Sequence, residues 1–143
     1  MGKTSTMNRS KRIWSGLATL AMVTTGSAVA AHHDNIEPVA KPGQVIVTYR
    51  GDCPSDAIDD AIALIKEAIA YERKNSPILY TSSPGVWTDG KIGAVDLHES
   101  KAAMEKAFAW QAADEKWSAM YAGIASRCGL AVEDFEVVSL VAR

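Results

Sequence analysis

The segment Gln44–Arg50 (QVIVTYR) is the clearest β-strand in this sequence, and the rest of the fold can be built outward from it. Its β-branched and aromatic residues are typical of a strand. A segment of the same kind, Phe135–Val141 (FEVVSLV), lies at the end of the chain. We therefore expect the folded part of the chain to begin and end with a strand.

A helix is predicted directly after the first strand. Asp52-Cys53-Pro54 resembles a helix start, with proline at the first helical position. Apolar residues then recur at helical spacing from Ile58 to Ile69. Asn75-Ser76-Pro77 ends this helix, because the residue before a proline avoids helical geometry.

A β-hairpin is predicted next. Ile78–Ser82 is the outgoing strand, and Ser83-Pro84-Gly85 is expected to kink it before Val86-Trp87 resume. Asp89-Gly90 favours a tight turn, because both residues tolerate positive φ. Lys91–His98 is then the returning strand.

A second helical region is predicted over residues 101–127. Ser100 is placed to cap its start, and Gly129 to stop it. The apolar stripe loses phase near Gln111–Asp114, so we expect a break there, with Asp114 capping the new segment.

The resulting order, β-α-β-β-α-β, is the split βαβ or ferredoxin-like pattern. It predicts an α+β domain over residues 44–143, with one four-stranded antiparallel sheet and two helices on one face. Residues 32–43 are polar, contain two prolines and lack periodicity. We expect them to form a flexible arm.

The N-terminus predicts an exported protein. Basic residues up to Arg12 precede an apolar run, Ile13–Val23, and Ala28-Val29-Ala30 forms an A-x-A cleavage signature. We interpret residues 1–31 as a secretory signal peptide, because the apolar run is too short for stable insertion into a membrane. The mature protein is therefore expected in the periplasm or outside the cell.

Charge argues against one class of partner. The whole chain has a net charge of −2, and all 17 acidic residues lie beyond residue 31. Removal of the signal peptide takes away basic residues only, so the mature chain is more acidic than the whole chain. Nucleic acids and anionic membrane surfaces are excluded as expected partners.

Two cysteines are present, Cys53 and Cys128. In an exported chain we expect them to form a disulfide, and the predicted topology places both at the same end of the sheet. Two separate buried thiols are the alternative.

The site of cleavage decides a metal hypothesis. Cleavage after Ala30 gives the N-terminus Ala31-His32-His33, whose amine, two amides and imidazole form a square-planar nitrogen set suited to Cu(II) or Ni(II). Cleavage after Ala31 removes that chelate, and a polar arm without metal is the alternative. No other cofactor is predicted.

Two segments carry a resemblance to a known superfamily. Gly93–Ser100 (GAVDLHES) resembles the third strand and second helix start of the dimeric α/β-barrel proteins, and Ala107–Trp117 (AFAWQAADEKW) resembles their mid-helix break with its aromatic anchor. This superfamily includes antibiotic-biosynthesis-monooxygenase-like and stress-responsive A/B-barrel domains. The resemblance implies a dimer that packs two sheets face to face, and a small aromatic or lipid-like ligand between sheet and helices.

The strands point to the same dimer. One face of the sheet is expected to carry Ile46, Thr48, Val138 and Leu140, and the other Val45, Val47, Tyr49, Val137 and Val141. Helices on one side cover a single face only, so an apolar second face requires another layer. We expect a second copy of the chain to supply it.

His98 and Asp96 are the candidate catalytic residues. They should share one face of the third strand, because side chains alternate along a strand. A carboxylate two positions away can orient the imidazole or raise its pKa, which suits a general acid or base. The alternative is a strand-end histidine that is solvated or contacts Glu99.

Aromatic residues are the candidate walls of a ligand pocket. The candidates are Tyr49, Tyr80, Trp87, Trp110 and Trp117. Packing in the core or at a dimer interface is the alternative for each of them. Arg50 lies at a strand end, where it can bind a carboxylate or form a surface ion pair.

The sequence therefore predicts an exported homodimer that binds a small hydrophobic or aromatic molecule. One alternative is a cofactor-independent monooxygenase or cyclase-like enzyme that uses His98 and Asp96. The other is a structural or stress-related protein whose interior is filled by its own side chains.

Overall fold

The computed structural model describes residues 37–143, which form one ferredoxin-like α+β unit. Its elements, in chain order, are β1 (Val45–Gly51), α1 (Ile58–Asn75), β2 (Tyr80–Val86), β3 (Ile92–His98), α2 (Lys101–Ala113), α3 (Glu115–Arg127), the short 3-10 helix η2 (Val132–Asp134) and β4 (Glu136–Val141). The predicted signal peptide, His32 and His33 lie outside the described residues.

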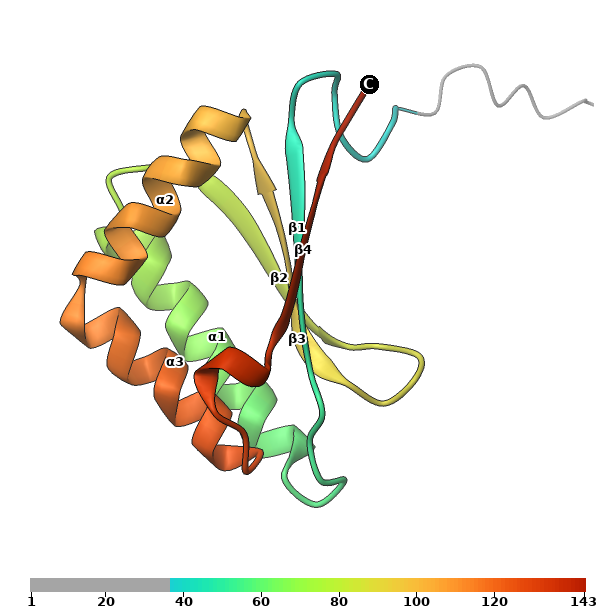
Figure 1. Cartoon of the computed structure of the whole chain (residues 1–143), viewed down its shortest axis with the longest axis vertical. Helices are drawn as coiled ribbons and strands as arrows, with labels where there is room; N and C mark the ends of the chain where they lie inside the picture. Colours follow the sequence, from blue (N-terminus) through green and yellow to red (C-terminus); the bar gives the residue numbers. More distant parts are fainter. Residues whose placement is uncertain (1–36) are drawn as a thin grey trace, which may run out of the picture. The chain divides into compact units, whose positions relative to one another are not determined.

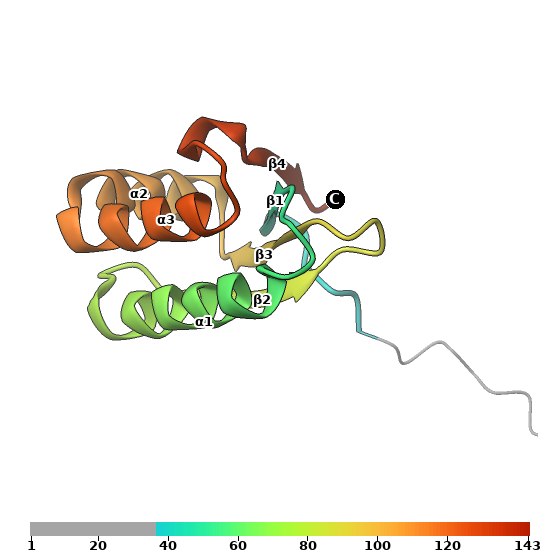
Figure 2. The same cartoon turned by 90° about the horizontal axis from the view of Figure 1, so that it is seen from below.

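The four strands form one antiparallel sheet in the order β2-β3-β1-β4. The three helices lie on one side of this sheet (Figures 1 and 2). This arrangement confirms the predicted fold class. The last strand pairs beside the first, as the predicted topology requires.

The strand register divides the sheet into two faces. The inner face, turned toward the helices, includes the fully buried Val45 and Val47 of β1 and Ile92 of β3. The outer face carries the aliphatic and small side chains that alternate with these. They are Ile46, Thr48, Val95, Leu97, Val138 and Leu140.

The core lies between the inner face and the helices. Helix α1 contributes the stripe Ala61, Ile65, Ala68 and Ile69, whose spacing places them on one side of the helix. Ile124 of α3 packs into the same cluster. In contrast, β4 is exposed along its whole length, so the helices leave this edge of the sheet uncovered.

Helix α1 begins later than predicted. Pro54 lies in a turn that its carbonyl closes by accepting a hydrogen bond from the Ala57 amide (2.9 Å), and the helix starts at Ile58. Asp52-Cys53-Pro54 thus precedes the helix and does not start it. Cys53, just before this turn, forms a disulfide with Cys128 at the end of α3, which confirms the predicted bridge.

The predicted kink in the second strand is absent. Ser83, Pro84 and Gly85 all pair with β3, and β2 runs without interruption, although it starts two residues later than expected. The sheet tolerates Pro84 because β2 is an edge strand, where a missing amide need not break the ladder.

The second helical region is divided as predicted. Ser100 caps α2 by accepting a hydrogen bond from the Ala103 amide (3.2 Å). Asp114 has an extended backbone and caps α3 by accepting from the Trp117 amide (2.8 Å). This break turns the chain so that α3 packs against α1.

The residues just before β1 pair with the residue just after β4. The Gly43 amide donates to the Ala142 carbonyl (3.0 Å), and the Ala142 amide donates to the Gln44 carbonyl (2.9 Å). The last residues of the predicted arm are thereby attached to the end of β4. Within residues 37–143, no helix combines the length and apolarity needed to cross a membrane.

Candidate functional site

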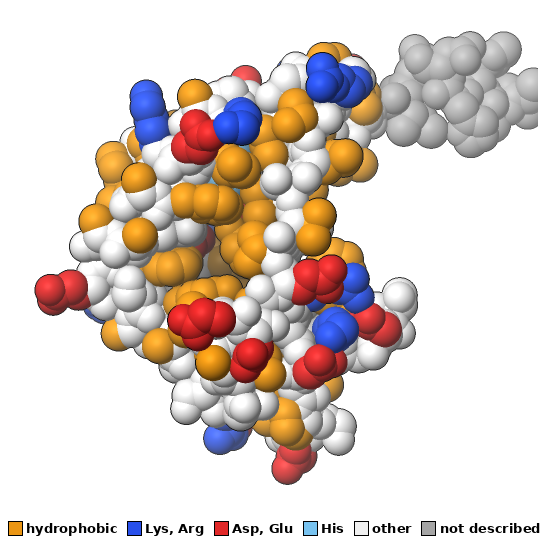
Figure 3. All heavy atoms as spheres, in the orientation of Figure 1, with side chains coloured by type: hydrophobic (Ala, Val, Ile, Leu, Met, Phe, Trp, Pro, Cys, Tyr) orange, Lys and Arg blue, Asp and Glu red, His pale blue; other side chains and the backbone are white. Residues whose placement is uncertain are grey.

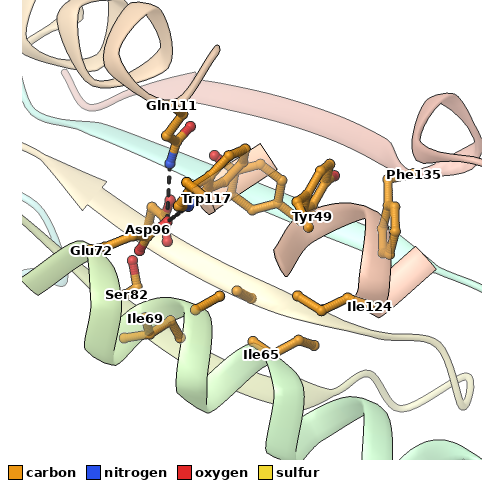
Figure 4. A pocket seen from close by; sticks show the side chains of 14 residues that line it. Tyr49, Ile65, Ile69, Glu72, Ser82, Asp96, Gln111, Trp117, Ile124 and Phe135 are labelled. Carbon is orange, nitrogen blue, oxygen red and sulfur yellow. Dashed lines mark hydrogen bonds between the residues drawn. The ribbon is translucent and has the colours of Figure 1, made fainter. Parts of the chain in front are cut away.

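A cavity lies between the inner face of the sheet and helices α1 and α3. It encloses about 50 Å³. Figure 3 shows a hollow, surrounded by hydrophobic side chains, between the helical layer and the exposed strand β4. Most of its wall is apolar and includes the side chains of Ile65, Ile69, Ile124 and Phe135 (Figure 4).

One end of the cavity is polar. Glu72 of α1 and Asp96 of β3 lie close together there, with Ser82 of β2 beside them (Figure 4). Glu72 is 7% exposed and Asp96 is 3% exposed. The chain therefore places two carboxyl groups in a largely apolar interior, where an ionised group is costly.

Two donors from the second helical region fix the Glu72 carboxyl group. The Trp117 indole Nε1 donates to its Oε1 (2.6 Å), and the Gln111 Nε2 donates to the same oxygen (3.1 Å). The Gln111 amide also donates to the Tyr80 hydroxyl (3.1 Å). One carboxylate oxygen thus connects α1, α2 and α3.

Burial changes the proton affinity of both carboxyl groups. The pKa of Asp96 is raised to about 7: burial is the main cause and the nearby Glu72 carboxyl group adds to it, whereas the hydroxyl groups of Ser82 and Tyr49 oppose the rise. Burial also raises the pKa of Glu72, and the hydrogen bonds from Trp117 and Gln111 oppose that rise. Asp96 is therefore poised to gain or lose a proton near neutral pH.

Two hydroxyl groups in the cavity wall are unsatisfied. Ser82 Oγ and Tyr49 Oη are buried and have no hydrogen-bond partner within the described structure. Both lie close enough to Asp96 to favour its ionised form, although neither makes a hydrogen bond of good geometry to it. Buried polar groups without partners are rare in proteins and often mark a place where a ligand or a water molecule binds.

His98 lies behind this site and does not line the cavity. It is 0% exposed, stacks on Tyr80 (4.7 Å between ring centroids) and meets Phe108 edge-on (6.0 Å). Its Nε2 lies 3.9 Å from Asp96 Oδ2, and neither ring nitrogen has a hydrogen-bond partner within residues 37–143.

Of the two effects expected from Asp96, orienting the His98 imidazole or raising its pKa, the rise in pKa is not found. Burial lowers this pKa, because the surrounding aromatic rings cannot solvate an imidazolium. His98 and Asp96 do share the inner face of β3, as the strand pattern predicted. The alternative of a solvated histidine is also wrong, since the side chain is fully buried.

The structure separates the five aromatic candidates. Tyr49 and Trp117 line the cavity, and Tyr80 lies just outside its wall, where it receives the Gln111 hydrogen bond. Trp110 stacks on Tyr71 (6.4 Å between centroids) and is not part of the wall.

Trp87 lies at the hairpin and is also outside the cavity wall. Its indole Nε1 donates to the Tyr49 carbonyl (3.2 Å). Gly93 is required beside this contact, because a Cβ there would lie 1.8 Å from the same carbonyl oxygen. Arg50 lies over the Trp87 ring and forms ion pairs with Asp89 (2.5 Å) and Glu136 (3.6 Å).

Glu72 and Gln111 are site residues that the sequence interpretation missed, although a signal was present. Glu72 continues the buried stripe of α1, four residues after Ala68 and three after Ile69. Gln111 follows the buried Ala107 by four residues. A polar residue at a core position of an amphipathic helix was the signal, since it must find a buried partner.

The described residues contain no cluster of three or more side chains suited to holding a metal ion. The predicted copper or nickel chelate at Ala31-His32-His33 falls outside residues 37–143 and stays a prediction.

Comparisons with known proteins identify the fold. No protein-family model and no curated protein sequence matches the chain. Among solved structures, a conserved protein from Methanosarcina mazei Go1 superimposes with a TM-score of 0.53 at 8% identity, over 70% of this chain and 93% of that one. An antibiotic biosynthesis monooxygenase superimposes with a TM-score of 0.50 at 20% identity, over 69% and 98%.

A cofactor-independent oxygenase from Streptomyces nogalater, studied as an N63A mutant, gives a TM-score of 0.49 at 13% identity, over 71% and 94%. The superpositions on the Methanosarcina mazei protein and on the antibiotic biosynthesis monooxygenase show a shared fold, and at 8% and 20% identity they show nothing about activity. The chain accordingly has the ferredoxin-like fold found in the antibiotic biosynthesis monooxygenase.

Proposed function

We propose that this protein is an exported homodimer that binds a small apolar or aromatic molecule in the cavity between its sheet and its helices. The observation that carries this proposal is the combination of apolar walls with an unsatisfied polar end. Small-molecule sites typically have this composition, in which apolar surface supplies affinity and a few polar groups fix orientation.

The size of the cavity limits how a ligand lies in it. The enclosed space is about 50 Å³, whereas an apolar cavity that accepts benzene measures about 150 Å³. A ring therefore fits only toward the open hollow in Figure 3, with a narrower group directed inward to Glu72 and Asp96.

The outer face of the sheet supports a homodimer. Val138 is 51% exposed, Leu140 is 61% exposed, and Val95 adds to the same surface. No element within residues 37–143 covers this side of the sheet (Figure 2). A second copy, docked through a two-fold axis, would bury identical apolar surfaces against each other.

Export is supported by the predicted signal peptide and by the Cys53–Cys128 disulfide. Disulfides persist mainly in oxidising compartments outside the cytoplasm.

Binding is tested with neutral aromatic probes on the purified mature protein. We expect 2-phenylethanol and indole to bind at one site per chain in ligand-observed NMR. Ala68→Leu, which fills the cavity wall, should weaken binding at least tenfold, whereas Ala70→Leu on the exposed side of α1 should not. Equal binding by both variants, or no binding by the wild type together with no retained ligand in native mass spectrometry, would refute the proposal.

Overfilling can unfold a core, so a second variant enlarges the cavity. Ile124→Ala removes part of its wall and should admit a bulkier probe such as 1-naphthol.

The dimer has its own test. Light scattering after size exclusion should give twice the chain mass for the wild type. Leu140→Arg, which places a charge on the outer face, should give a monomer. A wild type that stays monomeric at 100 µM would remove this part of the proposal.

One observation favours an enzyme as the second candidate function. Asp96 lies in the cavity wall with a pKa raised to about 7, which matches the requirement for a general base at neutral pH. In a cofactor-independent oxygenase or cyclase-like reaction, Asp96 would take a proton from the bound molecule, with His98 as a neutral neighbour. Asp96→Asn should then abolish turnover while leaving binding of a neutral ligand within about threefold.

A further inference from the structure

We infer that the ligand of this cavity is a primary amine, whose ammonium group binds between Glu72 and Asp96 while its apolar part faces the open hollow. This inference rests on the proposed function, because it names the chemical class of ligand for the same cavity.

Charge balance is the first argument. The cavity wall contains two carboxyl groups and no lysine or arginine from the described residues. Arg73 directs its guanidinium to the Ser82 carbonyl oxygen (3.2 Å) and is not part of the wall. Burial lowers the pKa of His98 and so favours its neutral form. Buried carboxylates without a counter-ion are costly, so a cationic ligand would stabilise this end of the cavity most.

The arrangement of acceptors is the second argument. An ammonium group has three N–H donors and no acceptor. The polar end offers a carboxyl group on Asp96, another on Glu72 and the hydroxyl of Ser82. Ser82 is 6% exposed, and its Oγ has no partner within the described structure. The three N–H donors of an ammonium group thus match three acceptor groups, one each from α1, β2 and β3.

The aromatic residues of the wall are the third argument. Trp117 and Tyr121 stack on each other with centroids 5.0 Å apart, and both line the cavity together with Tyr49. Aromatic faces attract cations, most strongly when both are removed from water. They also provide apolar contact for the carbon next to the amine.

Size excludes bulkier cations. A space of about 50 Å³ admits a group of a few heavy atoms. An ammonium on a methylene chain fits this limit, whereas a ring or a quaternary ammonium does not. The ligand class is therefore an alkylamine or an arylalkylamine, with its tail against Ile65 and Ile124.

Binding of an amine next to Asp96 should be coupled to the loss of a proton from this carboxyl group, which can be measured. The groups that face Asp96 are Glu72 from α1, Tyr49 from β1, Ser82 and Tyr80 from β2, His98 from β3, Gln111 from α2 and Trp117 from α3. Glu72 is the one acidic neighbour among them. A cation bound here favours ionised Asp96, so binding below pH 7 should release a proton to the solvent.

The experiment compares 2-phenylethylamine with its neutral isostere 2-phenylethanol by calorimetry on the mature wild-type protein. At pH 7.5 we expect the amine to bind at least tenfold tighter. At pH 5 this preference should fall by tenfold or more, and titrations in buffers of different ionisation enthalpy should show proton release.

Matched variants separate the site from general charge. Asp96→Asn should abolish the preference for the amine, whereas Asp59→Asn on the exposed side of α1 should retain it. Ser82→Ala should reduce the preference severalfold, and the exposed Ser83→Ala should leave it unchanged. The serine pair keeps the inference testable if Asp96→Asn does not fold.

The outcomes distinguish the two levels of the proposal. Equal affinities for the two compounds, or tighter binding of the alcohol, would overturn the amine and leave the ligand-binding function intact. Binding of neither compound would remove the ligand-binding function together with the amine. An amine preference that persists in Asp96→Asn would place the cation elsewhere and overturn the inference.

Discussion

The two faces of the sheet contrast in an unusual way. The inner face is buried, yet it carries Asp96, His98 and Ser82, together with Tyr49 at the cavity wall. The outer face is exposed, yet it carries aliphatic side chains such as Leu140. Soluble monomers usually show the opposite distribution, with polar groups outside and apolar groups inside.

This contrast assigns a different role to each face. Polar groups persist in a core at a cost in stability, which is typical of a binding or catalytic site. Exposed aliphatic side chains on a sheet are typical of a surface that associates with a partner. The inner face is therefore the site of the proposed ligand binding, and the outer face is the surface of the proposed homodimer.

The disulfide provides the largest test of what holds the helices over the inner face. It joins residues 75 positions apart, from the end of β1 to the end of α3. In the chain-entropy model a loop of this length stabilises the fold by about 4 kcal/mol. The double variant Cys53→Ser with Cys128→Ser should lose about that much free energy of unfolding in urea titrations followed by circular dichroism. A loss below about 1 kcal/mol would show that packing alone holds the layer.

A pair of aliphatic truncations compares the two faces directly. Ile92, on the inner face, is 0% exposed, and Ile92→Ala should lower the free energy of unfolding by about 3 kcal/mol because it opens a void in the core. Leu140→Ala on the outer face should change the stability of the monomer by less than about 0.5 kcal/mol. Its effect should appear instead as a higher dissociation constant of the proposed dimer. Similar losses in the free energy of unfolding of the monomer for both variants would contradict the contrast between the two faces.

The pH dependence of stability tests the buried carboxyl group. The pKa of Asp96 is raised by burial to about 7 from an unfolded value of 3.8. The folded state therefore holds a proton that the unfolded state releases, and the stability contributed by this group falls as pH rises from about 4 to 7. The slope is at most about 1.4 kcal/mol for each pH unit.

Asp96→Asn isolates this effect. Glu72 acts with the same sign, whereas His98, whose pKa is lowered, acts with the opposite sign, so the wild type alone gives a mixed slope. The difference between Asp96→Asn and the wild type should grow in favour of the variant between pH 4 and 7. Parallel stability profiles would mean that Asp96 ionises normally in the folded protein.

Helix capping provides the smallest test. Asp114 starts α3, which carries Trp117 and Ile124 into the cavity wall, and Ser100 starts α2. Asp114→Ala and Ser100→Ala should each cost about 1 kcal/mol, because each removes an acceptor for an orphan amide. Only Asp114→Ala should also change the near-ultraviolet signal of Trp117. The same signal change in both variants would show that α2 and α3 move as one body.

The sequence predicted the framework of this fold well. The alternation of the two sheet faces and the capped break at Asp114 follow from local patterns that tertiary contacts do not overrule. The Cys53–Cys128 bridge follows from the predicted topology, which places both cysteines at the same end of the sheet. The start of α1 and the continuity of β2 were wrong for one reason. A proline fixes its own backbone angle, but this angle is compatible with more than one structure. Pro54 lies in a turn before α1, and Pro84 lies in the edge strand β2.

The candidate site was only partly predictable. Asp96 and His98 are two residues apart in a strand, so the sequence gives their shared face directly. The pairing of Glu72 with Gln111 and Trp117 joins residues 39 and 45 positions apart. Such contacts depend on how the helices pack, and a single sequence does not specify this. The pKa values of Asp96 and His98 depend on the same packing, because burial sets both.

The pairing of Gly43 with Ala142 has a consequence for the connectivity of the chain. The start of the central strand β1 and the end of the edge strand β4 meet at this point. A short linker from residue 143 to Gly43 would therefore close the backbone without disturbing a strand. New ends opened at the Asp89-Gly90 turn would give a circular permutant with the same sheet order, because the order of strands in space does not require the chain to begin at β1.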